Sequence, residues 1–345
     1  MNQVKLNSSA KSTSHMLPIK FAQAGKHILV HLISAEKLNM MWGFFRDSLK
    51  ALPDGQVPEK IIDLKTWLKL NEQPVTSLPE IGFIFHISRC GSTLLSQNLK
   101  ASQRFVVLGE AEFLGGIYGE QTCIPANLRA TVAQRALKAW NQWAYSCNKQ
   151  LICKLNSKKI SRRKCLREDF PKSKMLFLYR EPVSVTESLI RKPSGSIAKQ
   201  CWLDDANSLV QENGEQGEKD SGLKVSPSGY VAQVYLFCLT EIKAAILGGH
   251  FACDYRHLSR DFSKIVDFFI DSKTGKTLIK SEAMDEKLEW NNHWSAKKGE
   301  WQSKTYLPVS EESMYTFRQN NLRLLEPLKA IYDEVVAMES NNASV

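Results

Sequence analysis

Short apolar runs alternate with amphipathic, helix-like stretches along most of the chain from residue 81 onward. The runs are nearly continuous in apolar residues, which is typical of strands buried on both faces of a sheet. Strands of this kind separated by helices predict an α/β fold, a three-layer sandwich with a central parallel sheet. The five predicted strands cover residues 81–87, 105–108, 150–155, 174–179 and 249–255.

The first 80 residues follow a different pattern. Residues 1–25 are rich in Ser and Lys and hold no continuous apolar segment, so we predict a flexible N-terminal tail. Residues 26–80 are expected to form an N-terminal extension packed on the core. The predicted elements of this extension are a strand at 27–33 and helices around 36–51 and 58–70.

The C-terminal part, residues 81–340, is expected to form one domain. Within it, residues 211–229 are polar and rich in Gly and Ser, which predicts a loop long enough to act as a lid or to be disordered. A last helix is expected from about 310 to 338, with Ser310 as its N-cap.

The composition indicates a globular protein with a positive charge. The chain has 345 residues and a formal net charge of +10, from 46 Lys and Arg against 36 Asp and Glu. No window approaches the roughly 18 uncharged apolar residues of a membrane span, and the N-terminus does not resemble a secretion signal. The eight cysteines show no C-x-x-C spacing, which disfavours a zinc ribbon or a redox pair and suggests a reducing compartment. We therefore expect a cytoplasmic protein with no metal site.

The positive charge is concentrated in residues 154–174. Nine Lys and Arg face two acids there, which leaves +7 in 21 residues. The segment fits the solvated face of a helix at about 159–169, and it equally fits an electrostatic funnel for a polyanion such as a phosphorylated nucleotide or a nucleic acid.

A first chemical motif, SRCGST at residues 88–93, joins the predicted strand 81–87 to an amphipathic helix. A tight polar turn before a helix aims unpaired backbone N–H groups and the positive helix end at one point, which suits a phosphate. The pattern G-x-x-x-x-G-K-[ST] is missing, so a standard ATPase or GTPase is disfavoured. The residues expected to form this cradle are Arg89, Cys90, Gly91, Ser92 and Thr93.

This motif resembles the 5′-phosphosulfate loop of the sulfotransferases, in particular the branch with tyrosylprotein and many bacterial members. That loop reads P-[RK]-S-G-[TS]-T after a strand. Here Ser88 stands in place of the usual Pro and Cys90 in place of the usual Ser, and neither change removes a charge. The resemblance covers about residues 81–301 and implies a P-loop-like α/β fold.

A second motif lies at the end of the predicted strand 174–179. Arg180 ends that strand, and Ser188 follows eight residues later in the next helix. A strand-end guanidinium and a hydroxyl two helical turns on can bracket one phosphate. The segment resembles the family's 3′-phosphate motif, R-[DE]-P-x-x-x-x-x-S, with both residues and their spacing preserved.

Further site residues follow from the same resemblance. Glu110, in a Gly-Glu pair, corresponds to the family's catalytic base, although Glu112 remains an alternative, and Lys154 resembles the lysine beside the transferred group. Tyr255 belongs to a segment similar to the family's Y-E-x-L, with Arg256 in place of the usual Glu. The remaining candidates, for the nucleotide phosphates, are Lys297 and Lys298 in a partial match to the closing loop R-K-G-x-x-G-x-W.

The resemblance implies a sulfotransferase that uses 3′-phosphoadenosine 5′-phosphosulfate as donor and needs no metal. Arg89 and Lys154 would then act on the transferring group, and Glu110 would take the proton of a small-molecule or carbohydrate acceptor. Two alternatives stay open: a nucleotide-dependent phosphotransferase on the same cradle, and a nucleic-acid-binding protein that uses residues 154–174. Under the sulfotransferase hypothesis, no nucleic-acid partner is expected. The sequence leaves the acceptor, the role of residues 1–80 and the oligomeric state undetermined.

Overall fold

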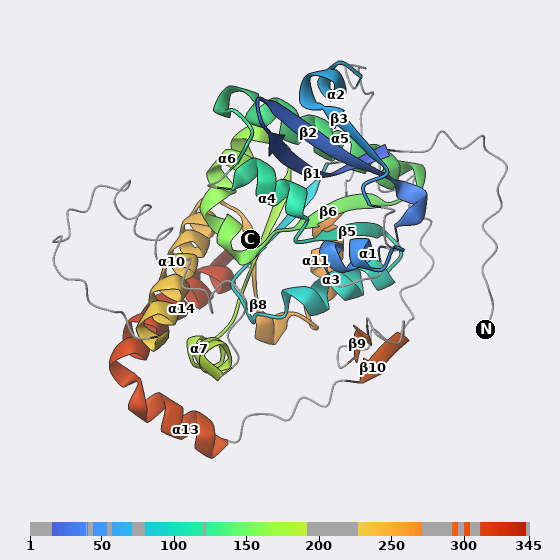
Figure 1. Cartoon of the computed structure of the whole chain (residues 1–345). Helices are drawn as coiled ribbons and strands as arrows, with labels where there is room; N and C mark the ends of the chain where they lie inside the picture. The colour runs from blue at the N-terminus through green and yellow to red at the C-terminus, as the bar shows by residue number, and fades with distance from the viewer. Residues whose placement is uncertain are drawn as a thin grey trace.

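The computed structural model contains two sheets that share one hydrophobic core, with a separate two-stranded ribbon (Figure 1). It describes residues 16–38, 40, 44–53, 57–70, 80–119, 122–191, 227–270, 292–295, 300–303 and 311–342.

The central sheet has five parallel strands in the order β5-β6-β4-β7-β8. The predicted α/β class with a central parallel sheet is therefore confirmed. Each predicted strand is present, and the last one is shorter than expected. The strands are β4 (Gly82–His86), β5 (Phe105–Gly109), β6 (Gln150–Lys154), β7 (Lys174–Tyr179) and β8 (Phe251–Asp254).

Helices cover both faces of this sheet, which gives the three layers. Successive side chains of a strand point to opposite faces. A Cβ on Gly82 would lie 2.6 Å from the ring of Phe269 in α11 (Phe262–Phe269), whereas the ring centre of Phe83 lies 5.6 Å from that of Phe170, which directly follows α6 (Arg163–Asp169). α11 and the end of α6 therefore pack on opposite faces of β4.

The helices around the sheet agree only in part with the predicted ones. The single last helix expected at about 310–338 is in fact two helices, because a turn at Asn321 separates α13 from α14. The basic helix expected at 159–169 is a 3₁₀ turn, Ser157–Arg162, followed by α6. The long polar loop was predicted to end at 229, but α10 already begins at Pro227; residues 192–226 and Ser310 lie outside the described residues. The α-helices of the described residues from 80 onward are α3 (Ser92–Ala101), α4 (Glu112–Tyr118), α5 (Arg129–Ser146), α6 (Arg163–Asp169), α7 (Pro182–Arg191), α10 (Pro227–Leu247), α11 (Phe262–Phe269), α13 (Glu311–Asn320) and α14 (Leu322–Asn342). The two strands of the ribbon are β9 (Asn292–Ser295) and β10 (Glu300–Ser303).

The predicted tail is wrong at Met16–Ala24, which form strand β1. Its Leu17, Pro18, Ile19 and Phe21 are buried while Lys20 is exposed, an apolar run too short and too interrupted to stand out as a continuous apolar segment. β1 pairs antiparallel with β2 (His27–Ser34), which confirms the strand expected there.

The two helices predicted in the N-terminal extension are also wrong in part. The first is reduced to a 3₁₀ turn, Ala35–Lys37, and the short helix α1 (Phe45–Lys50). The second starts as strand β3 (Lys60–Asp63), which pairs with the free edge of β2, and only then becomes α2 (Leu64–Leu70). Pairing with that edge satisfies backbone groups that a helix would have satisfied internally.

The N-terminal sheet packs against α4 and α5 (Figure 1). The indole Nε1 of Trp140 in α5 donates to the carbonyl oxygen of Pro18 in β1 at 3.0 Å, and the same indole ring contacts Phe45 edge-on with ring centres 5.4 Å apart. Both contacts are buried, so the extension shares the core of the domain. Within the described part of the chain, no helix combines the length and the apolar character that crossing a membrane requires.

Candidate functional site

The loop between β4 and α3 carries the first motif at the carboxyl end of the central strand. Arg89 and Gly91 both have left-handed backbone angles, with φ of 62° and 79°. Gly91 is the N-cap of α3, and its carbonyl oxygen accepts from the N–H of Leu95 at 3.0 Å. The next amides open a helix and have no intrahelical acceptor, so they form an anion-binding concavity.

The side chains of this loop differ in what they offer to an anion. Cys90 is fully buried, and burial raises the pKa of its thiol to about 12, so it contributes backbone only. The Thr93 hydroxyl lies 3.5 Å from the Nζ of Lys154, and the Ser88 hydroxyl lies 3.1 Å from that of Ser157. The hydroxyl of Thr93 thus connects the loop to β6.

Arg180, from the second motif, reaches this loop. Its Nη1 donates to the carbonyl oxygen of Arg89 at 3.2 Å, and its Cζ lies 4.3 Å from the ring centre of Tyr255. A Cβ on Gly91 would lie only 2.6 Å from two carbons of the Tyr255 ring. The structure therefore brings together four predicted site residues from the loops after β4, β7 and β8, at the sheet edge where open α/β sheets bind ligands.

Ser188 lies on α7, which begins directly after Arg180. The carboxylate of Glu181 caps this helix by accepting from the N–H groups of Val183 and Ser184 at 2.8 and 2.9 Å. Ser188 itself is half-buried. The other predicted phosphate contacts, Lys297 and Lys298, lie outside the described residues.

Glu110 and Lys154 meet at the carboxyl ends of β5 and β6. The Nζ of Lys154 donates to Oε1 of Glu110 at 2.8 Å, and Nδ2 of Asn156 donates to Oε2 at 3.2 Å. The backbone N–H of Glu110, a residue with φ of 55°, donates to the carbonyl oxygen of Lys154 at 2.7 Å. Both oxygens of the carboxylate are therefore oriented by side chains of the neighbouring strand end.

This pair lies in a buried environment. The Lys154 side chain is 0% exposed, and its Nζ lies 4.6 Å from the ring centre of Phe44. Burial by itself raises the pKa of Glu110, but the charge of Lys154 and the hydrogen bonds to the carboxylate outweigh it and lower that pKa below its usual value. Glu110 is consequently ionised at neutral pH.

A cavity of about 290 Å³ opens beside Glu110. Glu112, the alternative base, is exposed and lines the same cavity from the first turn of α4, whereas the ion pair of Lys154 is with Glu110. The geometry therefore favours Glu110 as the carboxylate beside the cradle. The other lining residues are Ala111, Leu114, Gly115, Leu155, Asn156, Lys158 and Lys159.

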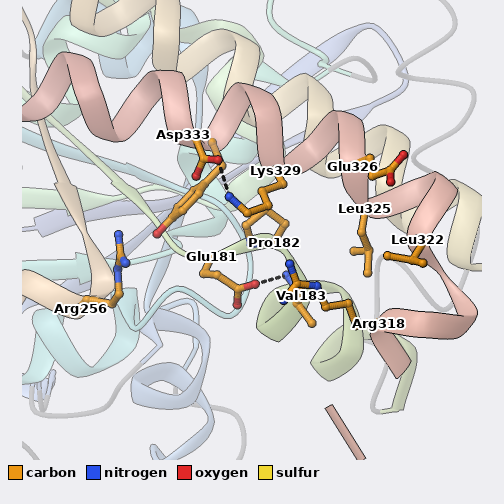
Figure 2. A pocket seen from close by; sticks show the side chains of 11 residues that line it. Glu181, Pro182, Val183, Arg256, Arg318, Leu322, Leu325, Glu326, Lys329 and Asp333 are labelled. Atoms are coloured by element: carbon orange, nitrogen blue, oxygen red, sulfur yellow. Dashed lines mark hydrogen bonds and ion pairs between the residues drawn. The ribbon is translucent and has the colours of Figure 1, made fainter. Parts of the chain in front are cut away.

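A second cavity, of about 280 Å³, lies between the start of α7 and the helices α13 and α14 (Figure 2). Its charged lining is mixed, with Arg256, Arg318 and Lys329 against three acids. It gives no clear preference for an anion. The acids are Glu181, Glu326 and Asp333.

Several charges of the basic segment 154–174 have partners within the chain. Arg163 donates to Glu241 at 2.7 Å, Arg167 to the carbonyl oxygen of Ser173 at 2.8 Å, and Lys174 to that of Ile270 at 2.7 Å. With Lys154 buried as well, this segment is not a continuous solvated face, and its charge is less available to a polyanion than the sequence indicated.

A group of possible metal ligands includes a residue of β8. Three ligand atoms, one each from Cys253, Asp261 and Glu339, lie within 4.8 Å of one another. The carboxylate of Asp261 is paired with Arg260 at 2.7 Å and with Lys264 at 3.3 Å. Tyr179 donates to the Glu339 carboxylate. Both acids are thus held by groups of the chain itself.

Sequence reasoning missed three residues of the site: His86, Asn156 and Tyr235. Asn156 binds Glu110, and the Tyr235 hydroxyl donates to the backbone oxygen of Arg180. His86 is the last residue of β4, with its side chain 6% exposed and its Nε2 3.8 Å from Oε1 of Glu110. The sequence marks His86 only as the one polar residue in the apolar run IGFIFHI.

Comparisons with known proteins give little further information. No family model and no curated protein sequence matches the chain. Among solved structures, it is similar to the crystal structure of a sulfotransferase from Alicyclobacillus acidocaldarius, at 12% sequence identity and a TM-score of 0.41, over 76% of this chain and 97% of that one. This similarity is too low to support a conclusion about the chain. The fold class therefore follows from the observed strand order alone.

Proposed function

We propose that the protein is a sulfotransferase that moves a sulfuryl group from 3′-phosphoadenosine 5′-phosphosulfate to a hydroxyl or amine of a small-molecule or carbohydrate acceptor. The observation that supports this most is the contact of Arg180 with Arg89 and Tyr255, because it joins the two sequence motifs into one anion site. A donor with phosphate groups on both the 3′ and the 5′ position of one ribose needs two such motifs side by side.

In this proposal each end of the donor has its own residues. The loop Arg89–Thr93 binds the 5′-phosphosulfate through its amides and hydroxyls, and Arg180 with Ser188 binds the 3′-phosphate. Lys297 and Lys298 are assigned to the phosphates on sequence resemblance only.

The acceptor enters through the cavity beside Glu110. Its oxygen forms a bond to sulfur while the bond from sulfur to the phosphate oxygen breaks, and its proton passes to the carboxylate of Glu110. Lys154, 2.8 Å from that carboxylate and 3.5 Å from Thr93, neutralises the charge that develops on the leaving oxygen.

A phosphotransferase on the same cradle is less well supported. It requires an acid at a strand end that can hold Mg²⁺. Asp254, at the end of β8, is fully buried and accepts from the backbone and guanidinium of Arg256 and from the hydroxyl of Tyr332 at 2.5 Å. Its oxygens are already engaged, and Glu110 is engaged by Lys154.

The proposal is tested by incubating the enzyme with donor that carries a radioactive sulfuryl group and a panel of phenols, sugars and amines. Wild type should transfer label to at least one class, and Lys154→Met should reduce the rate about 100-fold or more at unchanged fold, judged by circular dichroism. Transfer of phosphate from ATP in place of sulfate from the donor would overturn the assignment.

A further inference from the structure

His86 is a buried histidine whose two ring nitrogens are in different situations. The Nδ1 lies 2.9 Å from the carbonyl oxygen of Ile87. A carbonyl oxygen only accepts hydrogen bonds, so Nδ1 carries the proton and Nε2 keeps a lone pair. The structure thereby fixes which tautomer of the ring is present.

The Nε2 of His86 has no hydrogen-bond partner among the described residues. A buried acceptor left in this state costs about 1–3 kcal/mol. Its neighbour is Oε1 of Glu110 at 3.8 Å, and an ionised carboxylate has no proton to donate. The acceptor is thus placed against a group that can satisfy it only after taking up a proton.

The surroundings keep the imidazole neutral. Burial, followed by the charge of Lys154, lowers the pKa of His86 to about 4, against the opposing influence of Glu110 and of the backbone carbonyls of Ile87 and Leu155. At neutral pH, Nε2 therefore remains an acceptor while Glu110 is ionised.

We propose that His86 is a positioning residue for proton uptake: its Nε2 accepts a hydrogen bond from the Glu110 carboxyl group once that group has taken the acceptor's proton. The catalytic part of this statement rests on the proposed function. In the step, the O–H bond of the acceptor breaks, the O–S bond forms, and the electron pair of the S–O bond leaves with the bisphosphate. The proton stays on Glu110 and is shared with Nε2, so no further reactant is needed.

This contact would offset a weakness of Glu110 as a base. The pairing with Lys154 that keeps Glu110 ionised also favours its charged form and so makes it a weaker proton acceptor. A hydrogen bond that forms only with the protonated carboxyl stabilises the products of proton transfer and not the resting state. The two atoms need only close from 3.8 Å to hydrogen-bond distance, about 2.6–3.2 Å.

The first test needs no donor and no acceptor. The variant Glu110→Gln places an amide N–H donor where the protonated carboxyl would be. In protein labelled with ¹⁵N-histidine, the NMR resonance of His86 Nε2 should move from the position of a free acceptor in wild type to that of a hydrogen-bonded one in Glu110→Gln. The control Glu112→Gln should leave it in place. An Nε2 resonance that is the same in wild type and Glu110→Gln would overturn the proposal.

The second test separates positioning from packing. His86→Asn keeps a side-chain N–H near Ile87 but lacks the distant acceptor, whereas His86→Gln restores an acceptor near the Nε2 position. We expect His86→Asn to lower kcat about tenfold with an unchanged KM for the donor and a shifted acidic limb of the pH profile, and His86→Gln to recover most of the rate. Equal rates and pH profiles for wild type and His86→Asn would overturn it. If the wild type transfers no sulfate, the proposed function fails, and the NMR comparison still decides whether His86 pairs with position 110.

Discussion

Glycine is required at position 91 for two reasons, the left-handed backbone angle and the close approach of the Tyr255 ring. An alanine in the left-handed region costs about 1–2 kcal/mol. The added Cβ would also lie 2.6 Å from the Tyr255 ring, and relieving such overpacking costs typically about 1–3 kcal/mol more. Gly91→Ala should therefore lower the free energy of unfolding by about 2–5 kcal/mol.

The chain offers a matched control for the backbone contribution alone. Gly249 has a φ of 75°, close to the 79° of Gly91, and a Cβ there would meet nothing within 4 Å. Gly249→Ala should cost only about 1–2 kcal/mol. Urea unfolding with linear extrapolation measures both values.

A double-mutant cycle then isolates the contact with the ring. In a Tyr255→Ala background, the cost of Gly91→Ala should fall to that of Gly249→Ala, because the obstructing ring is gone. The reasoning is refuted if Gly91→Ala costs no more than Gly249→Ala in the wild-type background, or if its cost is the same with and without the Tyr255 ring.

Three further predictions concern the core and the base. Trp140→Phe removes the indole N–H that donates to the carbonyl oxygen of Pro18 and leaves this oxygen unsatisfied, so the free energy of unfolding should fall by about 1–3 kcal/mol. An unchanged midpoint of chemical unfolding would argue against the docking of β1 on α5. Burial lowers the pKa of Lys100 from 10.5 to about 7, so the folded protein disfavours the charged amine. The free energy of unfolding therefore falls as the pH falls from about 10.5 to about 7. Lys100→Met should therefore raise Tm, and raise it more near neutral pH than near pH 10; a gain that does not depend on pH would contradict this sign. Glu110→Gln should reduce sulfuryl transfer about 100-fold or more while leaving bisphosphate affinity within about twofold, measured by initial rates and calorimetry; full activity would remove Glu110 from the role of base.

The sequence was most informative where side chains are buried on both faces of a strand. The run that became β4 is apolar throughout except for its last residue, and such a run has few alternatives to a central parallel strand. β1 and β3 were missed because each pairs with only one neighbour, so the apolar residues form short runs interrupted by charged ones and resemble a tail or a helix start.

The residues of the candidate site also differ in how far the sequence could predict them. Arg89, Gly91 and Arg180 stand in motifs of fixed spacing next to strand ends, so their convergence could be predicted from the parallel sheet. The roles of His86 and Asn156 could not, because each depends on which face of a strand end meets Glu110 from another strand, and that depends on the register between β4, β5 and β6. A buried histidine in an apolar run is indistinguishable from a core residue until that register is known.

Under the proposed function, the loop after β4 and Arg180 together bind a nucleotide with phosphates at both its 3′ and 5′ positions. Calorimetric titration with adenosine 3′,5′-bisphosphate, beside adenosine 5′-monophosphate and ATP with Mg²⁺, tests it most directly. We predict micromolar binding of the bisphosphate and about tenfold or more weaker binding of the monophosphate. Arg180→Ala should lose about 1.4 kcal/mol or more of binding free energy for the bisphosphate alone. Tight binding of ATP with Mg²⁺ and none of the bisphosphate would contradict it.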